Sequence, residues 1–333
     1  MTQFLRDSIP ALLYGAKILP SEILNSVDDF ANVWYVDGDN GSDSNVGNTP
    51  TTAFKTIQAA VTASSADDVI KVRTMNMAAG VTDPASYTEN IIIPAGKSRL
   101  KIFGINSGLT QGGLPQVKVG TTTTAAILKV RAPGVLIAGL GFNGAGATGG
   151  GILLDDDGST KTAFGTTIFG CHFKNCKGST ATDCRTGGAI MWTSDGNAWQ
   201  VRISGNTFYK NVGDVVLPGT SNSVPQDVII ENNTFQGIAT AVDCHLFLTG
   251  GGSGMLGVTV NNNTFADVLP ALSSGSIVRY VDMTGCTGIF SNNFVAGSYT
   301  TSGFGAAKAA AKIATTVGIV HNYSDAGLIV REA

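Results

Sequence analysis

The chain has 333 residues, of which 14% are charged, and it carries a formal net charge of −3 and 43 glycines. Its basic residues form no cluster, so nucleic acid and anionic membrane surfaces are not expected partners. No apolar run approaches the ~20 residues of a membrane-spanning helix. The five cysteines have neither disulfide-framework nor zinc-site spacing, so no cofactor is expected.

Two short apolar runs occur at helical spacing in residues 1–33. Pro10 interrupts the first, and the second follows Ser21, a favourable N-cap residue. Their apolar residues are Leu5, Ile9, Leu12, Leu13 and Ala16, then Ile23, Val27 and Phe30. Helices this short have no core of their own, so residues 1–33 are predicted to be a helical anchor that docks on the rest of the chain or on another protein. A clear secretory cleavage site is missing, so export is not expected.

Residues 34–66 are predicted to form an N-terminal cap. A strand at 34–36 leads into a loop rich in Gly, Asp and Asn, and a helix over 52–64 places Phe54, Ile57 and Val61 on one face. A further strand follows at 69–72. Stacked strands leave an unpaired edge at the end of the stack, and this helix is well placed to cover it.

The order of residues in this region resembles the start of pectate-lyase-like right-handed β-helices, which occur in many bacterial surface proteins and bacteriophage spikes. The matching residues are Trp34–Val36, Gly41–Asp43, Asn45, Gly47, Pro50, Phe54–Gln58, Ala60–Val61, Asp68–Val72 and Tyr87–Ile93. The resemblance implies a fold and says little about activity, because lyases, hydrolases, epimerases and inert spikes share this fold.

From Val135 onward one short pattern recurs: a β-branched residue, an aliphatic residue two positions later, and a closing aromatic. The closing aromatics are Phe142, Phe173, Phe208, Phe235, Phe265, Phe294 and Tyr323, with 27 to 35 residues between successive ones. Such a period, with strand-like alternation, indicates coils that bury their apolar faces by stacking. We therefore predict an all-β protein, a right-handed single-stranded parallel β-helix over residues 34–333, with the aromatics in its core.

In four copies an asparagine precedes the closing aromatic by two positions. These residues are Asn206, Asn233, Asn263 and Asn292. Asparagine tolerates left-handed backbone, and stacked side-chain amides bond along a column. We predict a ladder of asparagines at one corner of successive coils.

Other apolar runs predict further strands, at 96–105, 115–120, 125–132, 188–193, 214–219, 241–248 and 276–283. The Ala-rich segment 302–314 is instead predicted to be a short helix on a lateral loop. No second capping helix follows it, so the C-terminal end of the stack is expected to be covered by a partner.

Enzymes of this fold carry recognisable acids. Polygalacturonase-type sites begin with Asn-Thr-Asp, whereas this chain has Asn-Thr-Phe three times and no Gly-His-Gly. Asp155, Asp156 and Asp157 follow a strand and offer oxygen ligands to a hard cation, as in pectate lyases, or form a solvated loop tip. No Arg or Lys is placed by a motif on a neighbouring strand for lyase chemistry.

One set of polar and aromatic residues comes from equivalent strands of successive coils: Trp192, Asp195, Asp214, Asp243, His245, Arg279, Tyr280 and Asp282. If these residues point outward, they form a column suited to sugar binding or, as the commoner explanation, to a subunit interface. Asp243 and His245 share a strand face and are the acid–base pair to test for catalysis.

These observations predict a bacteriophage virion structural protein, either a spike or a capsid or tail decoration protein, rather than an enzyme. It would assemble in the host cytoplasm, self-associate as a homotrimer, attach to other virion proteins through residues 1–33, and bind host-surface polysaccharide. One alternative is a tailspike polysaccharide depolymerase, a lyase or a glycoside hydrolase. Another is a bacterial surface adhesin, which would need an export route.

Overall fold

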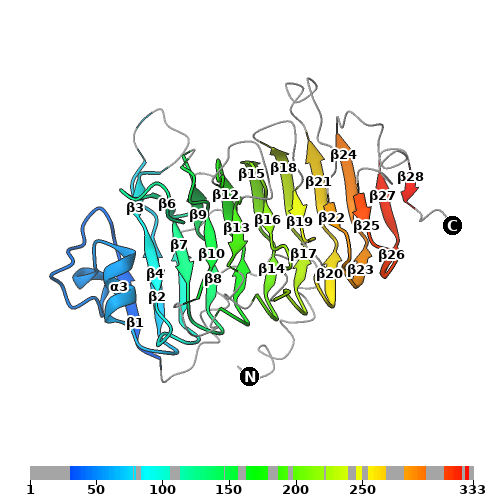
Figure 1. Ribbon diagram of the computed structural model, residues 1–333. Coiled ribbons are helices and arrows are strands. Elements are labelled where there is room, and N and C mark those ends of the chain that lie inside the picture. Colours follow the sequence, from blue (N-terminus) through cyan, green and yellow to red (C-terminus); the bar gives the residue numbers. More distant parts are fainter. Residues whose placement is uncertain are drawn as a thin grey trace, which may run out of the picture.

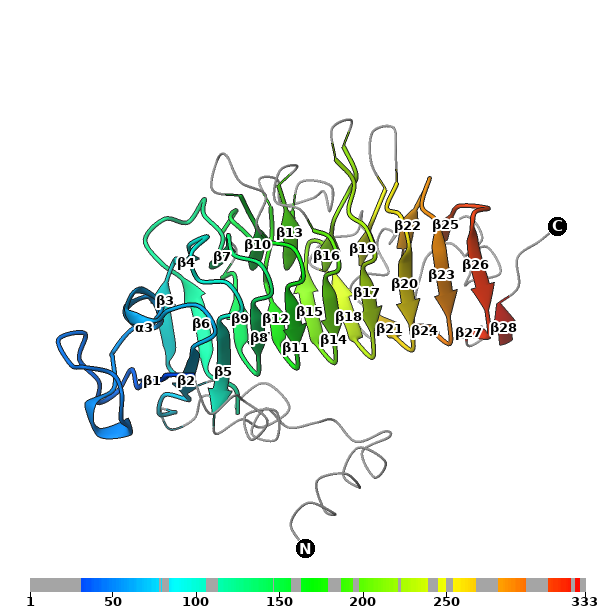
Figure 2. The same ribbon diagram turned by 90° about the horizontal axis from the view of Figure 1, so that it is seen from below.

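The computed structural model describes residues 31–77, 79, 84–105, 113–145, 147–156, 163–178, 187–193, 198–220, 223–238, 245–249, 254–267, 281–297, 311–324 and 327–329. They form a rod of stacked coils in which three long sheets run side by side (Figure 1). The view turned by 90° shows the same regular succession of strands (Figure 2). The predicted all-β, right-handed parallel β-helix is confirmed.

The coils supply the strands of three sheets, called A, B and C. Sheet A consists of β1 (Val33–Val36), β2 (Val69–Arg73), β5 (Lys101–Ile105), β8 (Leu136–Ala138), β11 (Thr167–Phe169), β14 (Arg202–Ser204), β17 (Ile229–Glu231), β20 (Val258–Asn261), β23 (Gly288–Ser291) and β26 (Val317–Val320). Sheet B consists of β3 (Ser86–Glu89), β6 (Gln116–Val119), β9 (Gly141–Asn143), β12 (His172–Lys174), β15 (Thr207–Asn211), β18 (Thr234–Ile238), β21 (Thr264–Asp267), β24 (Phe294–Gly297), β27 (Asn322–Ser324) and β28 (Gly327–Ile329). Sheet C consists of β4 (Ile91–Ile93), β7 (Leu128–Val130), β10 (Ile152–Leu154), β13 (Ile190–Trp192), β16 (Val215–Val216), β19 (Leu246–Phe247), β22 (Val281–Met283) and β25 (Ala311–Ile313). From β2 to β25 each coil contributes one strand to each sheet, whereas β1 stands alone before them and β26, β27 and β28 follow.

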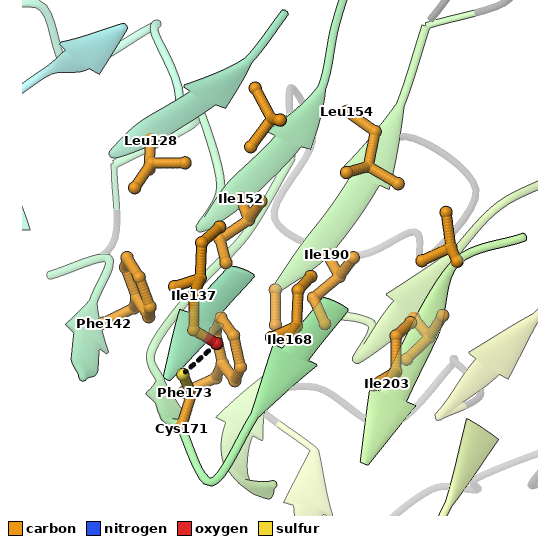
Figure 3. Packing of buried hydrophobic residues seen from close by; sticks show 14 of the residues in the cluster. Leu128, Ile137, Phe142, Ile152, Leu154, Ile168, Cys171, Phe173, Ile190 and Ile203 are labelled. Carbon is orange, nitrogen blue, oxygen red and sulfur yellow. Dashed lines mark hydrogen bonds between the residues drawn. The ribbon is translucent and has the colours of Figure 1, made fainter. Parts of the chain in front are cut away.

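The core lies inside the coils and is built of aliphatic columns in register. In sheet A, Ile137, Ile168 and Ile203 pair in successive strands and are fully buried. Leu128 and Ile152 do the same in sheet C. Figure 3 shows these side chains pointing toward one another from the different sheets. Because strand residues alternate between two faces, each inward residue leaves its neighbours on the outer surface.

Five of the predicted aromatics form one continuous stack in the core. The residues are Phe142, Phe173, Phe208, Phe235 and Phe265, all fully buried. Successive ring centroids lie 5.0, 5.0, 4.8 and 4.8 Å apart, and the rings are within 9° to 14° of parallel. Offset stacking of this kind contributes about 0.5–1.5 kcal/mol per pair beyond the buried area.

The last two predicted core aromatics are wrong. Phe294 and Tyr323 pair with each other across β24 and β27, and they are 44% and 50% exposed. Val295 faces Phe265 and takes the core position instead. The Thr-Phe ending of the earlier copies is replaced here by Phe294-Val295, so counting from the aromatic misplaces the register by one residue. A shift of one residue transfers a side chain to the opposite face.

The asparagine ladder is confirmed at three predicted positions and corrected at the fourth. Its buried members are Asn206, Asn233, Asn263, Asn293 and Asn322. Asn233 Oδ1 accepts from the backbone N–H of Asn206 at 2.9 Å, and its Nδ2 donates to Asn263 Oδ1 and to the Ile203 carbonyl, both at 3.0 Å. Asn292, which was predicted to belong, is the exposed residue before the ladder and has a left-handed φ of 54°. At position 292 asparagine tolerates the left-handed backbone, and at position 293 its amide satisfies buried backbone groups.

The predicted cap is present as helix α3 (Ile57–Ala63), after a short 3-10 helix η1 (Pro50–Thr52). Thr56 is the N-cap, with its hydroxyl accepting from Ala59 N–H at 3.2 Å. The Glu89 carboxylate accepts from Ile57 N–H and Gln58 N–H at 2.9 Å each and thereby ties the helix to β3. Ile57 is fully buried, so α3 closes the first coil at the blue end of the rod in Figure 1.

The acidic residues of the N-terminal motif are structural. Asp43 accepts from Lys55 N–H and Thr56 N–H at 2.9 Å each and positions the start of the helix. Asp68 accepts from Asn32 N–H at 3.0 Å and from Trp34 Nε1 at 2.9 Å. Each carboxylate satisfies backbone N–H groups that lie outside the regular strands, which explains the spacing of these acids in the motif.

The C-terminal end of the rod differs from the N-terminal end. Residues 311–313 form strand β25, which pairs with β22, so the helix predicted over 302–314 is wrong there. Sheet pairing overrides the helical propensity of alanine because it extends a ladder that already exists. Residues 302–310 lie outside the described residues. β28 pairs antiparallel with β27, whereas β25 and β26 are the last strands of their sheets within the described part of the chain.

Most of the predicted anchor, residues 1–30, lies outside the described residues. Among the helices that the structure describes, none has the length and apolar character needed to cross a bilayer.

We predict that Asn263→Ala destabilises the rod. The substitution removes the acceptor of Asn233 N–H and leaves buried backbone and amide groups without partners, which costs about 2–4 kcal/mol. The free energy of unfolding in urea measures this loss. Asn262→Gly is the matched control, because Asn262 is exposed and its φ of 52° suits glycine. Equal losses in the two variants would show that the ladder does not stabilise the coils.

Candidate functional surfaces

A charged cluster lies on the outer face of sheet C. Leu128 and Val130 point into the core, so Lys129 between them points outward. Arg131 Nε donates to Asp155 Oδ2 at 2.9 Å, and Lys129 Nζ lies 3.7 Å from the same oxygen. Asp155 is 6% exposed, so two cations neutralise a nearly buried carboxylate. An acid held in this way is poorly suited to bind a metal or to exchange protons.

The three predicted metal-ligand candidates do not form a ligand set in the described structure. Asp155 is engaged by Arg131 and Lys129, and Asp156 Oδ2 accepts from the Thr193 hydroxyl at 3.1 Å. Asp157 lies outside the described residues. Among the residues that the structure describes, no three His, Cys, Asp or Glu side chains are grouped to hold a metal ion.

An acid–imidazole pair lies inside the rod. His245 Nδ1 is 2.6 Å from Asp214 Oδ2, and the two side chains are 0% and 1% exposed. Asn211 Nδ2 donates to the other Asp214 oxygen at 2.8 Å. The imidazole lies against the Phe235 and Phe265 rings, with centroids 5.7 and 5.9 Å away. Sequence reasoning paired His245 with Asp243, which lies outside the described residues.

The expected outward column is therefore not present as predicted. Asp214 and His245 precede β16 and β19 and face the interior, because strand alternation does not apply to the corner residues before a strand. Asp282 lies in β22 and is 3% exposed, with Oδ1 accepting from the Thr284 hydroxyl at 2.7 Å. Trp192 is half-buried and donates from Nε1 to the Pro218 carbonyl at 2.8 Å. The other members, Asp195, Arg279 and Tyr280, lie outside the described residues.

A different row of side chains is exposed along the corner where sheet C turns into sheet A. Phe164, Trp199 and Leu256 are 44%, 38% and 43% exposed. Backbone bridges link Trp199 to Gln226 and Gln226 to Leu256, and Gly165 N–H donates to the Trp199 carbonyl at 2.8 Å. The corner ridge, defined as Phe164, Trp199, Gln226 and Leu256, therefore comes from four consecutive coils. At about 4.8 Å per coil it extends over roughly 14 Å.

The sequence carries a local signal for the corner ridge. Each ridge residue stands directly before a left-handed corner residue, which in turn precedes the repeated strand. The pairs are Phe164-Gly165, Trp199-Gln200, Gln226-Asp227 and Leu256-Gly257. In each pair the second residue has a φ between 52° and 69°. Aligning the copies on these corners, rather than on the closing aromatic, places the ridge residues in one column.

The described cysteines are not nucleophiles. Burial raises the pKa of the Cys171 and Cys176 thiols to about 12 and that of Cys286 to about 11. Cys171 occupies the ladder position one coil before Asn206, and its N–H donates to Asn206 Oδ1 at 2.9 Å. Its Sγ contacts the Ile137 carbonyl, as the dashed line in Figure 3 marks. These thiols stay protonated at neutral pH and serve as small core residues.

No family model matches the sequence, and no curated protein matches it. The solved structures that are similar to it include two of a GH136 lacto-N-biosidase from Eubacterium ramulus, one as a selenomethionine derivative and one native. They share 10% and 9% identity with this chain, each with a TM-score of 0.37, and the matches cover 88% of this chain and 67% of the enzyme.

We predict that the Asp214–His245 pair is a structural unit. His245→Phe leaves the Asp214 carboxylate buried without its imidazole partner and lowers the free energy of unfolding by about 3 kcal/mol. The double variant Asp214→Leu/His245→Phe removes both polar groups and loses less than the sum of the single variants, Asp214→Leu and His245→Phe. Urea unfolding of the four proteins tests this coupling. Strict additivity would refute it.

Proposed function

We propose that this protein is a non-catalytic structural rod of a bacteriophage particle, a spike or decoration protein, that binds host-surface glycan along the corner ridge. The exposed corner ridge is the observation that carries the proposal. The resemblance of residues 34–93 to a fold used in phage spikes supports the phage context.

The corner ridge has the chemistry of a carbohydrate platform. The apolar faces of sugar rings stack on aromatic side chains, and Phe164 and Trp199 present such surfaces in adjacent coils. Gln226 continues the row and offers an amide donor and acceptor to sugar hydroxyls. Trp199 Nε1 donates to the Val224 carbonyl at 3.0 Å, which fixes the indole before a ligand arrives. A platform that is already rigid binds at a lower entropic cost.

The C-terminal coils support self-association. Ile289, Phe294, Val320 and Tyr323 are all at least 36% exposed, and all belong to the last two coils of sheets A and B. Val320 lies in β26, the end strand of sheet A, and Ile289 lies in β23, which pairs with β26. The free edge of such an end strand has backbone groups able to pair with another chain. A cluster of exposed apolar side chains beside strand edges is typical of a subunit interface. We propose a homotrimer, with other virion proteins contacted through residues 1–33.

The polysaccharide depolymerase remains the second candidate. The described acids favour the non-catalytic structural rod over the depolymerase. Asp155 is neutralised by Arg131 and Lys129, and the Asp214–His245 pair is enclosed by the core. A glycosidase needs two carboxylates on opposite sides of a bound sugar, one to protonate the leaving group and one to activate water or attack. Neither of these acidic sites presents a free carboxylate to solvent.

Trp199→Ala is expected to weaken glycan binding about tenfold, or ~1.4 kcal/mol, because it removes one stacking surface. Trp199→Phe keeps a ring and should retain most of the affinity. Val46→Ala, at an exposed residue of the cap, is the control. Binding is measured by surface plasmon resonance on immobilised capsular polysaccharide and lipopolysaccharide. If reducing ends or unsaturated sugars are released instead, the depolymerase reading replaces this one.

The virion assignment and the trimer are tested together. Immunogold labelling of particles induced from the source strain should place this chain on the particle, and sedimentation equilibrium should give three chains per assembly. Phe294→Asp and Tyr323→Asp should shift the purified protein toward monomer, because each introduces a charge into the proposed interface. Unlabelled particles, or a monomer that dilution does not affect, would contradict the respective part of the proposal.

A further inference from the structure

A second apolar cluster lies on the outside of sheet A. Val69, Phe103 and Ala138 are fully buried, although their strand neighbours Ile70, Ile102 and Ile137 are the ones that point into the core. Leu136, Phe169, Val33 and Ala31 pack against them, and the cluster is separate from the main core. We call these seven residues the outer cluster.

The outer cluster needs a cover. Its described members lie side by side in β1, β2, β5, β8 and β11 or just before β1, and neighbours in one sheet flank a ring without shielding its outer face. Full burial of Phe103 therefore requires another part of the assembly above the sheet. Leaving such a patch open to water would cost about 25 cal/mol per Å² of apolar surface.

The chain itself supplies a cover at this place. Ala31 and Val33 belong to the outer cluster, and Asn32 is fixed by N–H and side-chain bonds to Asp68 at 3.0 and 3.1 Å. The described chain therefore begins at the border of the outer cluster. The thirty residues before it contain two apolar runs at helical spacing, and the nearer one ends in Ile23, Val27 and Phe30.

The dimensions agree. Beyond β1, where the described chain begins, the cluster spans four neighbouring strands, β2, β5, β8 and β11, which is about 14 Å at the usual strand spacing. A helix over residues 21–30 would be about 15 Å long at 1.5 Å per residue. One such helix is long enough to cross this part of the outer cluster with its apolar face.

We propose that residues 1–30 fold back over the outer face of sheet A, with the face that carries Ile23, Val27 and Phe30 packed on the outer cluster. The outer cluster is thus an intramolecular docking site. Any attachment of the rod to another protein through this segment would then use the opposite, polar side of the segment. This inference concerns the rod alone and stands whether or not the rod belongs to a phage particle.

The first test uses the full chain with a reporter, Leu136→Cys, whose alkylation rate reports access to the outer cluster. Adding Val27→Glu should accelerate alkylation at position 136 about tenfold or more, because a buried charge expels the segment. Asn25→Glu is the matched control, since Asn25 lies on the other side of the predicted helix, and it should leave the rate unchanged. Peptide mass spectrometry separates position 136 from the native cysteines.

The second test reads the segment from its own side. Trypsin can cut residues 1–30 only after Arg6 and Lys17. Leu136→Glu should raise the cleavage rate at Lys17 about tenfold, whereas Thr259→Glu, at the equivalent outward position four coils further along, should not. Circular dichroism confirms that both variants keep the rod.

Two outcomes would overturn the proposal. If Val27→Glu does not change alkylation at position 136, another part of the chain covers the outer cluster. If dilution over a hundredfold concentration range exposes position 136 in the parent protein, a second copy is the cover. The glycan-binding and particle measurements are separate from these, so the two proposals fail independently.

Discussion

The register between stacked coils is the constraint on which the rest of this structure depends. Parallel pairing fixes which residues of one coil lie above those of the next, and the buried asparagines lock that register at the corner between sheets A and B. Each amide satisfies a backbone N–H that the corner leaves without a partner in its own coil. Core columns, such as the phenylalanine stack, follow from this register, because a side chain that is displaced by one position leaves the core.

The same constraint decides which polar groups are available for chemistry. A polar group that falls on an inward position must find its hydrogen-bond partners inside the rod, as Asp214 does in His245 and Asn211. A group on an outward position near the corners remains in contact with solvent, as Trp199 does. The chain therefore places its acid–imidazole pair where it supports the rod and its exposed ring where it can meet a ligand. This division is why we assign binding to the surface and stability to the interior.

The two ends of the rod differ in how their outermost described strands are covered. At the N-terminal end α3 and Glu89 close the first coil. At the C-terminal end the described coils present strand edges and exposed apolar side chains, including Phe294. Strand edges with unpaired backbone groups can pair with another chain, and this is why we propose the described C-terminal coils as the site of self-association.

The sequence by itself determined the coil architecture, the N-terminal cap, five core phenylalanines and three ladder asparagines, because each rests on a local period that stacking preserves. It misplaced Phe294 and Asn292, since one exchanged residue in a copy shifts the count without disturbing the backbone register. It read residues 311–313 as helix because alanine favours helices locally, whereas pairing with β22 is a long-range effect. Only the tertiary structure brought Asp214 to His245, because this contact joins residues about one coil apart across a loop of variable length. Such contacts depend on how the coils are stacked in space, and no local pattern encodes them.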